Sequence, residues 1–130
     1  MLYKDFIKNI KRCPFCKNKE RWFIERQAAF LTYAIAPYAP YHLLVIPKRH
    51  IISFTNLKKA ERSDIDQLIF KGIKLLHRLG YKNCSVLVRD GDNAEKSIKH
   101  LHYHIIPNHR GDLDVTSKNR KVLTKTAIGK

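Results

Sequence analysis

The sequence predicts a single α+β domain built around a mostly antiparallel sheet. Five short apolar or aromatic segments are typical of strands, and one longer amphipathic segment is typical of a helix that interrupts their order. A chain of 130 residues with 44% hydrophobic content is long enough for one compact core and too short for two ordinary domains. We therefore expect one domain over residues 1–114, followed by a basic tail over residues 115–130.

The expected strands are short and are separated by turn residues. Residues 25–27 are typical of a turn between the first two strands, and a loop rich in proline and tyrosine precedes the third. The third reads as a buried strand ended by Pro47. A loop containing Asp-Gly-Asp-Asn separates the last two strands. In chain order the five strands are expected over residues 22–25, 28–34, 42–46, 84–88 and 100–106.

One long helix is predicted with both of its ends. Ser63 is expected at the N-cap, followed by Asp64 and Asp66 in the first turn, where carboxylates interact favourably with the helix dipole. Apolar residues then recur at three- and four-residue steps from Ile65 onward. Gly80 fits the position just past the helix end.

The charge balance points to anionic ligands. Lys and Arg number 26 against 11 Asp and Glu, which gives a formal charge of +15 and an attraction for phosphate-bearing molecules. Five basic residues and no acidic one follow residue 114. This basic tail has three interpretations that remain open: a nucleic-acid contact, a solvated segment, or a segment that docks on the partner subunit of a dimer.

Cysteine use and hydropathy indicate the compartment. No apolar run reaches the roughly 20 residues of a membrane helix, and the first residues lack the pattern of a secretory signal, so we expect a cytoplasmic protein. In a reducing compartment the Cys13-x-x-Cys16 pair indicates metal binding or redox chemistry rather than a structural disulfide. Cys84 stands in an apolar run and is expected to be a core residue. Glycine-rich phosphate loops are absent from the sequence.

Three histidines at alternate positions are the clearest indication of a catalytic or metal-binding site in the sequence. In a strand, His100, His102 and His104 share one face while the residues between them face the core. Such a face supports a nucleophilic imidazole that attacks phosphorus, or a catalytic zinc bound by three histidines. Spacing alone leaves both open, beside a purely structural role. The scarcity of carboxylates within the strand argues against Mg²⁺-assisted phosphoryl chemistry.

Two blocks of the sequence resemble the histidine triad (HIT) family. Residues 100–106 match its alternating pattern of histidine and apolar residues, and residues 37–50 resemble its second block, which ends in an apolar strand and Pro-Lys-x-His. The resemblance covers residues 13–112 and is nearest to the diadenosine polyphosphate hydrolase and phosphorylase branches. It implies a HIT-like fold with a mostly antiparallel sheet of about five strands, one long helix and one or two short helices.

The resemblance also implies a covalent mechanism. Members transfer or hydrolyse nucleotidyl groups through a nucleotidyl-histidine intermediate, typically as homodimers. By position His102 is the nucleophile, and the carbonyl of His100 orients its ring. The expected catalytic residues are His42, Ser97, His102 and His104, and the expected substrate-binding residues are Ile35, Lys96, Ser97 and His104.

A subset of the family binds structural Zn²⁺, and this chain has residues at the matching positions. The implied ligands are Cys13, Cys16, His50 and His100, a closed set of four with no position open to water. Such a zinc braces the histidine strand and takes no part in the reaction.

Three positions depart from the family's usual residues. Ala34 stands where most members place an Asp or Asn that holds the ribose hydroxyls, and Lys96 replaces a frequent Gln. Tyr41 replaces the usual Gly before His42 and is expected to crowd the edge of the pocket. Ala34 bears on nucleoside selectivity and on ribose binding itself, and Lys96 adds charge where the leaving group sits.

The predicted function is that of a nucleotidyl hydrolase or transferase acting on a dinucleoside polyphosphate or another nucleoside phosphate. A phosphorylase, with phosphate as acceptor in place of water, is a close variant. The alternative is a nucleic-acid-associated HIT protein that removes adenylate from nucleic-acid ends or senses nucleotide, with the basic tail docking RNA or DNA. A non-catalytic zinc module is a third hypothesis.

Overall fold

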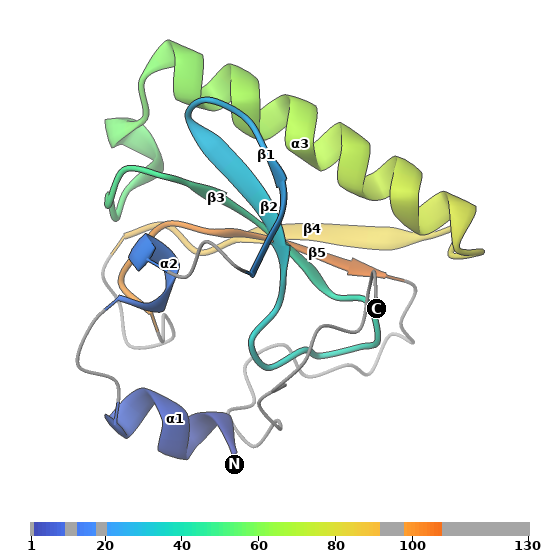
Figure 1. The fold of residues 1–130 in the computed structure, drawn as a ribbon, viewed down its shortest axis with the longest axis horizontal. Coiled ribbons are helices and arrows are strands. Elements are labelled where there is room, and N and C mark those ends of the chain that lie inside the picture. The colour runs from blue at the N-terminus through green and yellow to red at the C-terminus, as the bar shows by residue number, and fades with distance from the viewer. Residues whose placement is uncertain (1, 10–12, 18–20, 92–97, 108–130) are drawn as a thin grey trace.

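A computed structural model describes residues 2–9, 13–17, 21–91 and 98–107 of the chain. One long helix and a few short ones accompany five strands, which confirms the predicted α+β fold (Figure 1). The strands are β1 (Trp22–Glu25), β2 (Ala29–Tyr33), β3 (Leu43–Pro47), β4 (Cys84–Val88) and β5 (Tyr103–Pro107). The helices are α1 (Tyr3–Asn9), α2 (Pro14–Lys17), the 3₁₀ turn η2 (Phe54–Asn56) and α3 (Lys59–Arg78).

The strands form one antiparallel sheet in the order β1-β2-β3-β5-β4. Helix α3 crosses one face of the sheet, and α1 and α2 lie on the opposite side (Figure 1). Within the described ranges no helix is both long enough and apolar enough to cross a bilayer.

Alternating side chains give the sheet two buried faces. Toward α3, residues such as Leu31 and Val45 pack with Leu68 of the helix, forming a core that we call the α3-side core. On the opposite face Phe30 and Leu44 pack with residues of α1 and α2, forming the α2-side core. Because both faces are covered, the central strands read as continuous apolar runs rather than alternating ones.

Helix α3 approaches the sheet most closely at Gly72. A Cβ at this position would lie 2.8 Å from the Cδ1 of Ile105 in β5. A side chain at residue 72 would therefore push the helix away from the sheet or displace Ile105. The absence of a side chain at Gly72 therefore permits the close approach of α3 to β5, the strand that contains His104.

The start of α3 differs from the sequence prediction, and the N-cap predicted at Ser63 is wrong. The helix begins at Lys59, and the Glu61 carboxylate accepts a hydrogen bond of 2.7 Å from the Lys58 backbone N–H. Asp64 instead accepts hydrogen bonds from Arg26 Nε at 2.9 Å and the Ala28 backbone N–H at 2.8 Å. Its carboxylate fixes the turn between β1 and β2, a tertiary role that the local pattern does not reveal.

The end of α3 agrees with the prediction. Gly80 has a φ of +100°, the left-handed conformation that glycine adopts without steric cost. The N–H of Gly80 donates to the His77 carbonyl at 3.0 Å, and the N–H of Tyr81 donates to the Leu76 carbonyl at 3.0 Å. These two bonds form a Schellman motif, so the carbonyls of Leu76 and His77 are satisfied.

The histidine segment is only partly strand. β5 begins at Tyr103, so His100 and His102 lie just before it, where the Leu101 N–H donates to the Ile51 carbonyl at 2.7 Å instead of to a neighbouring strand. The predicted alternation of faces nevertheless holds. Leu101 and Tyr103 are in the α3-side core, and the ring of His102 contacts Phe15 of the α2-side core.

Candidate active site and metal centre

Sheet register brings the candidate catalytic histidines together. His104 pairs with Leu44 across β5 and β3, and His42 lies two residues before Leu44, so both rings share the face opposite α3. The Nε2 of His42 lies 3.0 Å from the Nδ1 of His104. Both side chains are buried, with His42 2% and His104 8% exposed. Two histidines 62 positions apart in the sequence therefore form one hydrogen-bonded pair.

Backbone contacts determine which nitrogen of each ring carries the proton. The Tyr38 backbone N–H donates to His42 Nδ1 at 3.1 Å, so in the neutral ring the proton is on Nε2. That Nε2–H then donates to His104 Nδ1, which places the proton of neutral His104 on its own Nε2. A main-chain amide thus sets His104 up as a hydrogen-bond donor, the form that suits a phosphate oxygen.

His102 carries the opposite tautomer. Its Nδ1 lies 2.7 Å from the His100 carbonyl oxygen, and because a carbonyl only accepts, the proton is on Nδ1. Nε2 is then the basic nitrogen of the ring. The rings of His102 and His104 meet edge to face with centroids 4.8 Å apart. A basic imidazole nitrogen beside an N–H donor is the arrangement that attack on a phosphoryl group requires.

A second group of side chains fits a metal ion. Donor atoms of Cys13, Cys16, His50 and His100 all lie within 4.8 Å of one another. The sulfur-to-nitrogen distances are 3.3 Å for Cys13–His100 and 3.2 Å for Cys16–His50, and the two Nδ1 atoms are 3.1 Å apart. Tetrahedral Zn–N and Zn–S bonds of about 2.0–2.3 Å place the ligand atoms about 3.3–3.8 Å apart. The donor atoms lie at or slightly inside that spacing, so small side-chain shifts would let them hold a tetrahedral ion.

Two further observations favour metal binding over redox chemistry. His100 donates from Nε2 to the Pro47 carbonyl at 2.8 Å, which directs Nδ1 toward the cysteines, as an outer contact of a metal ligand does. Burial raises the pKa of the Cys13 thiol to about 11, whereas redox-active pairs of this spacing lower the pKa of their reactive thiol. A divalent cation would offset the cost of burying the thiolate.

Comparisons with known proteins agree with this geometry. The HIT domain family model matches residues 16–111. The chain belongs to the HIT family. An uncharacterized HIT-like protein of Methanocaldococcus jannaschii is 31% identical over 110 residues, covering 79% of this chain and 84% of that protein.

Two other matches are a curated relative and a solved structure. The bis(5'-adenosyl)-triphosphatase of Saccharomyces cerevisiae is 32% identical over 104 residues, 72% of this chain. The chain spans about half the length, 48%, of that relative. A crystal structure of a Zn-bound histidine triad family protein from Mycobacterium smegmatis superposes with a TM-score of 0.66 at 24% identity, covering 79% of this chain and 80% of that one, which shows the shared fold.

The rim of the HIT site contains two tyrosines that flank His42. The Tyr38 ring stacks on the His42 ring at 5.4 Å and 27°. Tyr41 has a φ of +63°, a left-handed conformation that glycine adopts without steric cost and that fits the glycine expected here from the resemblance. Its ring is tilted against Tyr81 at 5.9 Å and packs on the α3-side core. Beside them lies a cavity of about 360 Å³ lined by Tyr33, residues 37–41 and His42.

The structure places some of the expected site residues and leaves others undescribed. His42, His102 and His104 come together, as do the four expected metal ligands. Ile35 is buried in the α2-side core, where it lines a small hollow together with Phe15. Ser97, Lys96 and the tail over residues 115–130 lie outside the described residues.

Sequence reasoning did not identify three contacts of the HIT site. Phe15, Tyr38 and the Pro47 carbonyl orient His102, His42 and His100 respectively. Phe15 lies between the paired cysteines and Tyr38 lies in the second block, so the motifs contained a signal for both. A backbone carbonyl leaves no signal in a sequence.

Proposed function

We propose that this HIT protein cleaves nucleotidyl groups from dinucleoside polyphosphates or related nucleoside phosphates through a covalent nucleotidyl-His102 intermediate. The observation that carries this proposal is the 2.7 Å hydrogen bond from His102 Nδ1 to the His100 carbonyl, which makes Nε2 the nucleophilic nitrogen. The yeast triphosphatase named above supports the substrate class. A formal charge of +15 favours encounter with polyphosphates.

The proposed reaction has two displacements at one phosphorus. Nε2 of His102 attacks the phosphorus, a phosphorus–nitrogen bond forms, and the bond to the leaving oxygen breaks, so that the nucleoside polyphosphate departs as an anion with the bonding electron pair. His104 donates from Nε2 to a non-bridging oxygen, stabilising the negative charge there. Water then attacks the same phosphorus and releases a proton to solvent, and the phosphorus–nitrogen bond breaks, which restores Nε2 of His102. With phosphate or another acceptor in place of water, the same steps give a transferase.

We assign Cys13, Cys16, His50 and His100 to a structural zinc. The four donors close the coordination sphere, so the ion would supply folding stability rather than an activated water. His100 links the metal group to the nucleophile, because its carbonyl accepts the hydrogen bond from His102 Nδ1. His50 also joins the loop after β3 to this group.

We further propose that the protein is a cytoplasmic homodimer. β4 forms one edge of the sheet, and its Val86 is 48% exposed, so an apolar edge is left for pairing with a second copy (Figure 1). Val86→Glu should halve the mass measured by light scattering. A wild-type protein that is monomeric at micromolar concentration would contradict the dimer without affecting the hydrolase proposal.

The decisive experiment is to incubate the zinc-loaded protein with a panel of adenylated and guanylated compounds. The wild type should release nucleoside monophosphate and, after acid-free quenching, show a mass increase of one nucleotidyl group on His102. His102→Ala should lose both signals. His77→Ala is the matched control, because His77 is exposed in the last turn of α3 and should retain full activity. Absence of adduct and turnover on every compound would exclude the proposal.

A further inference from the structure

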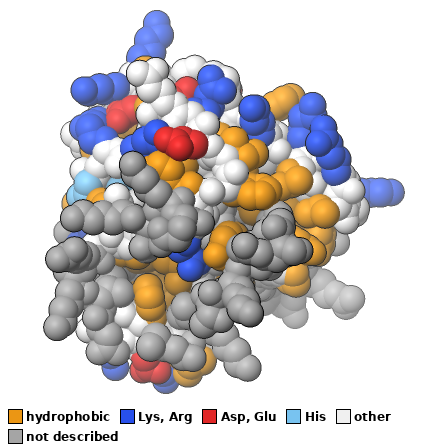
Figure 2. All heavy atoms as spheres, in the orientation of Figure 1, with side chains coloured by type: hydrophobic (Ala, Val, Ile, Leu, Met, Phe, Trp, Pro, Cys, Tyr) orange, Lys and Arg blue, Asp and Glu red, His pale blue; other side chains and the backbone are white. Residues whose placement is uncertain are grey.

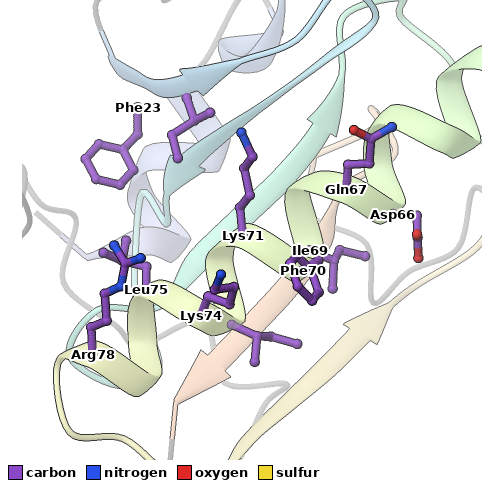
Figure 3. A pocket seen from close by; sticks show the side chains of 11 residues that line it. Phe23, Asp66, Gln67, Ile69, Phe70, Lys71, Lys74, Leu75 and Arg78 are labelled. Carbon is purple, nitrogen blue, oxygen red and sulfur yellow. The ribbon is translucent and has the colours of Figure 1, made fainter.

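A groove of about 830 Å³ lies on the α3 face of the molecule, across the sheet from the histidines. Figure 3 shows it between Phe23 of β1 and the outer surface of α3. Two phenyl rings line it while remaining open to solvent, with Phe70 63% and Phe23 38% exposed. Exposing two neighbouring phenyl rings to water does not stabilise the fold. Such an exposed apolar patch is typical of a surface that contacts a partner.

A β-bulge aims Phe23 at this groove. The register of β1 against β2 shifts between Trp22 and Ile24. Trp22 stacks on Phe30 of the α2-side core at 4.1 Å, whereas Ile24 packs on the α3-side core, so the two residues face opposite sides of the sheet. In a regular strand they would share one side. Phe23 is thus the extra residue of a bulge, a feature that redirects side chains at sheet edges.

Cationic side chains line the groove beside the two rings. Lys71, Lys74 and Arg78 recur at helical spacing along α3, and Figure 3 shows Lys71 between Phe23 and Phe70, with Arg78 toward the end of the helix. Lys74 Nζ lies 5.4 Å from the centroid of the Phe70 ring, a cation–π contact. Figure 2 shows Lys and Arg side chains gathered along the edge of the molecule where α3 lies.

Little acidic charge balances these cations. Asp66 is the one carboxylate among the residues that line the groove. Among the described residues, the three ion pairs join Arg26 to Asp64, Lys48 to Glu25 and Arg49 to Glu61, and none includes a groove cation. The groove therefore presents net positive charge beside accessible aromatic faces.

We propose that this groove binds single-stranded nucleic acid. Aromatic faces for bases, set beside cations for phosphates, are the combination that sequence-tolerant single-strand binding uses. From Lys71 to Arg78 the helix rises about 10 Å, which spans two or three phosphates of a flexible strand. The basic tail is not a suitable occupant, because its five cations would repel those of the groove. A second copy of the groove would be repelled for the same reason.

The first test measures charge contacts in the full-length protein. Binding of fluorescent 12-residue oligo(U) and oligo(dT) is followed by anisotropy from low to moderate salt. Three phosphate contacts predict a log–log salt slope of about −2 for the wild type. The triple variant Lys71→Gln, Lys74→Gln, Arg78→Gln should bind at least tenfold more weakly with a flatter slope. The control Lys4→Gln, Lys8→Gln, Lys59→Gln removes equal charge from exposed positions that do not line the groove and should bind within twofold of wild type.

The second test isolates the stacking contribution. Phe23→Leu and Phe70→Leu keep apolar volume but remove the ring, and each should weaken binding by about fivefold. His102→Ala should bind oligonucleotide as the wild type does, which separates this proposal from the catalytic one. Groove variants with unchanged affinity would overturn the proposal, because any binding would then lie elsewhere. Equal competition by polyglutamate, with no effect of the Leu variants, would assign the groove to an acidic polypeptide instead.

Discussion

The ring of Phe15 meets the ring of His102 edge to face, with centroids 5.0 Å apart and planes at 63°. Phe15 also contacts the His100 ring at 5.9 Å and lies between Cys13 and Cys16, on the short helix α2. The segment that carries two of the proposed metal ligands thus touches the proposed nucleophile directly. We expect the proposed zinc group to influence the orientation of His102 through this buried phenyl ring.

Phe15→Leu should reduce kcat by about tenfold while leaving KM within threefold, because a small displacement of a reacting group costs rate more than binding. The measurement is steady-state hydrolysis with zinc content checked by elemental analysis. Phe54→Leu is the matched control, since Phe54 is exposed in η2 and should retain wild-type kcat. An unchanged kcat in zinc-loaded Phe15→Leu would show that the ring contact has no role in positioning His102.

The hydrogen bonds from the Tyr38 N–H to His42 and from His42 to His104 form a relay that sets the tautomer of His104. Removing this relay should raise KM for the substrate. His42→Leu deletes the donor to His104 Nδ1, so the hydrogen bond that favours the Nε2–H tautomer of neutral His104 is lost. We expect KM for nucleotide to rise about tenfold, the value of one charge-assisted hydrogen bond of about 1.5 kcal/mol. Nitrogen NMR of labelled histidine should show the Nε2–H tautomer of His104 in the wild type and a mixture in the variant. A pure Nε2–H tautomer in His42→Leu would contradict the relay.

Metal removal should destabilise the protein without unfolding it at room temperature. The zinc group ties α2 and the loop after β3 to the histidine segment, so chelation should lower Tm by about 10 °C. Cys16→Ser should reproduce the loss and no longer respond to chelator. Cys84→Ser is the control, because Cys84 packs on the α3-side core and is not among the clustered ligands, so it should keep the chelator response.

Local pattern predicted most of the fold because both faces of the sheet leave clear signals. The β1 and β4 bounds, and the glycine after α3, follow from apolar runs and turn residues. The start of α3 could not be predicted from the local pattern. Asp64 resembles a first-turn carboxylate, but it accepts a hydrogen bond from Arg26, which is distant in the sequence. A carboxylate that makes a tertiary contact can therefore be mistaken in the sequence for one that begins a helix.

The site could be predicted to the level of side-chain types. Alternating histidines and the spaced cysteines indicated which residues meet, and the sheet register now explains why they meet. The resemblance to the HIT family also predicted that the His100 carbonyl orients the His102 ring, and the 2.7 Å hydrogen bond agrees. The tautomers of His42 and His100 could not be predicted, because they depend on the Tyr38 amide and on the Pro47 carbonyl. Backbone groups are identical at every residue, so only the fold tells which one faces a ring.

The loop that presents His50 depends on a bidentate ion pair. Arg49 donates from Nε and Nη2 to the two oxygens of Glu61 at 2.9 and 2.8 Å, and also to the Asn56 carbonyl at 2.7 Å. Glu61 is 5% exposed, whereas Glu25 in the Lys48 pair has a half-exposed side chain. Arg49 lowers the pKa of Glu61 below its ordinary value of 4.5.

That lowered pKa predicts a pH-dependent stability. The folded state holds Glu61 ionised more strongly than the unfolded state, so the pair stabilises fully above pH 4.5 and loses its contribution as pH falls below it. Glu61→Gln should therefore lower the urea midpoint at pH 7 and approach the wild type below pH 4.5. Glu25→Gln, which removes the exposed pair, should change the midpoint little at either pH. An equal deficit of Glu61→Gln at both pH values would mean that its loss acts through packing rather than charge.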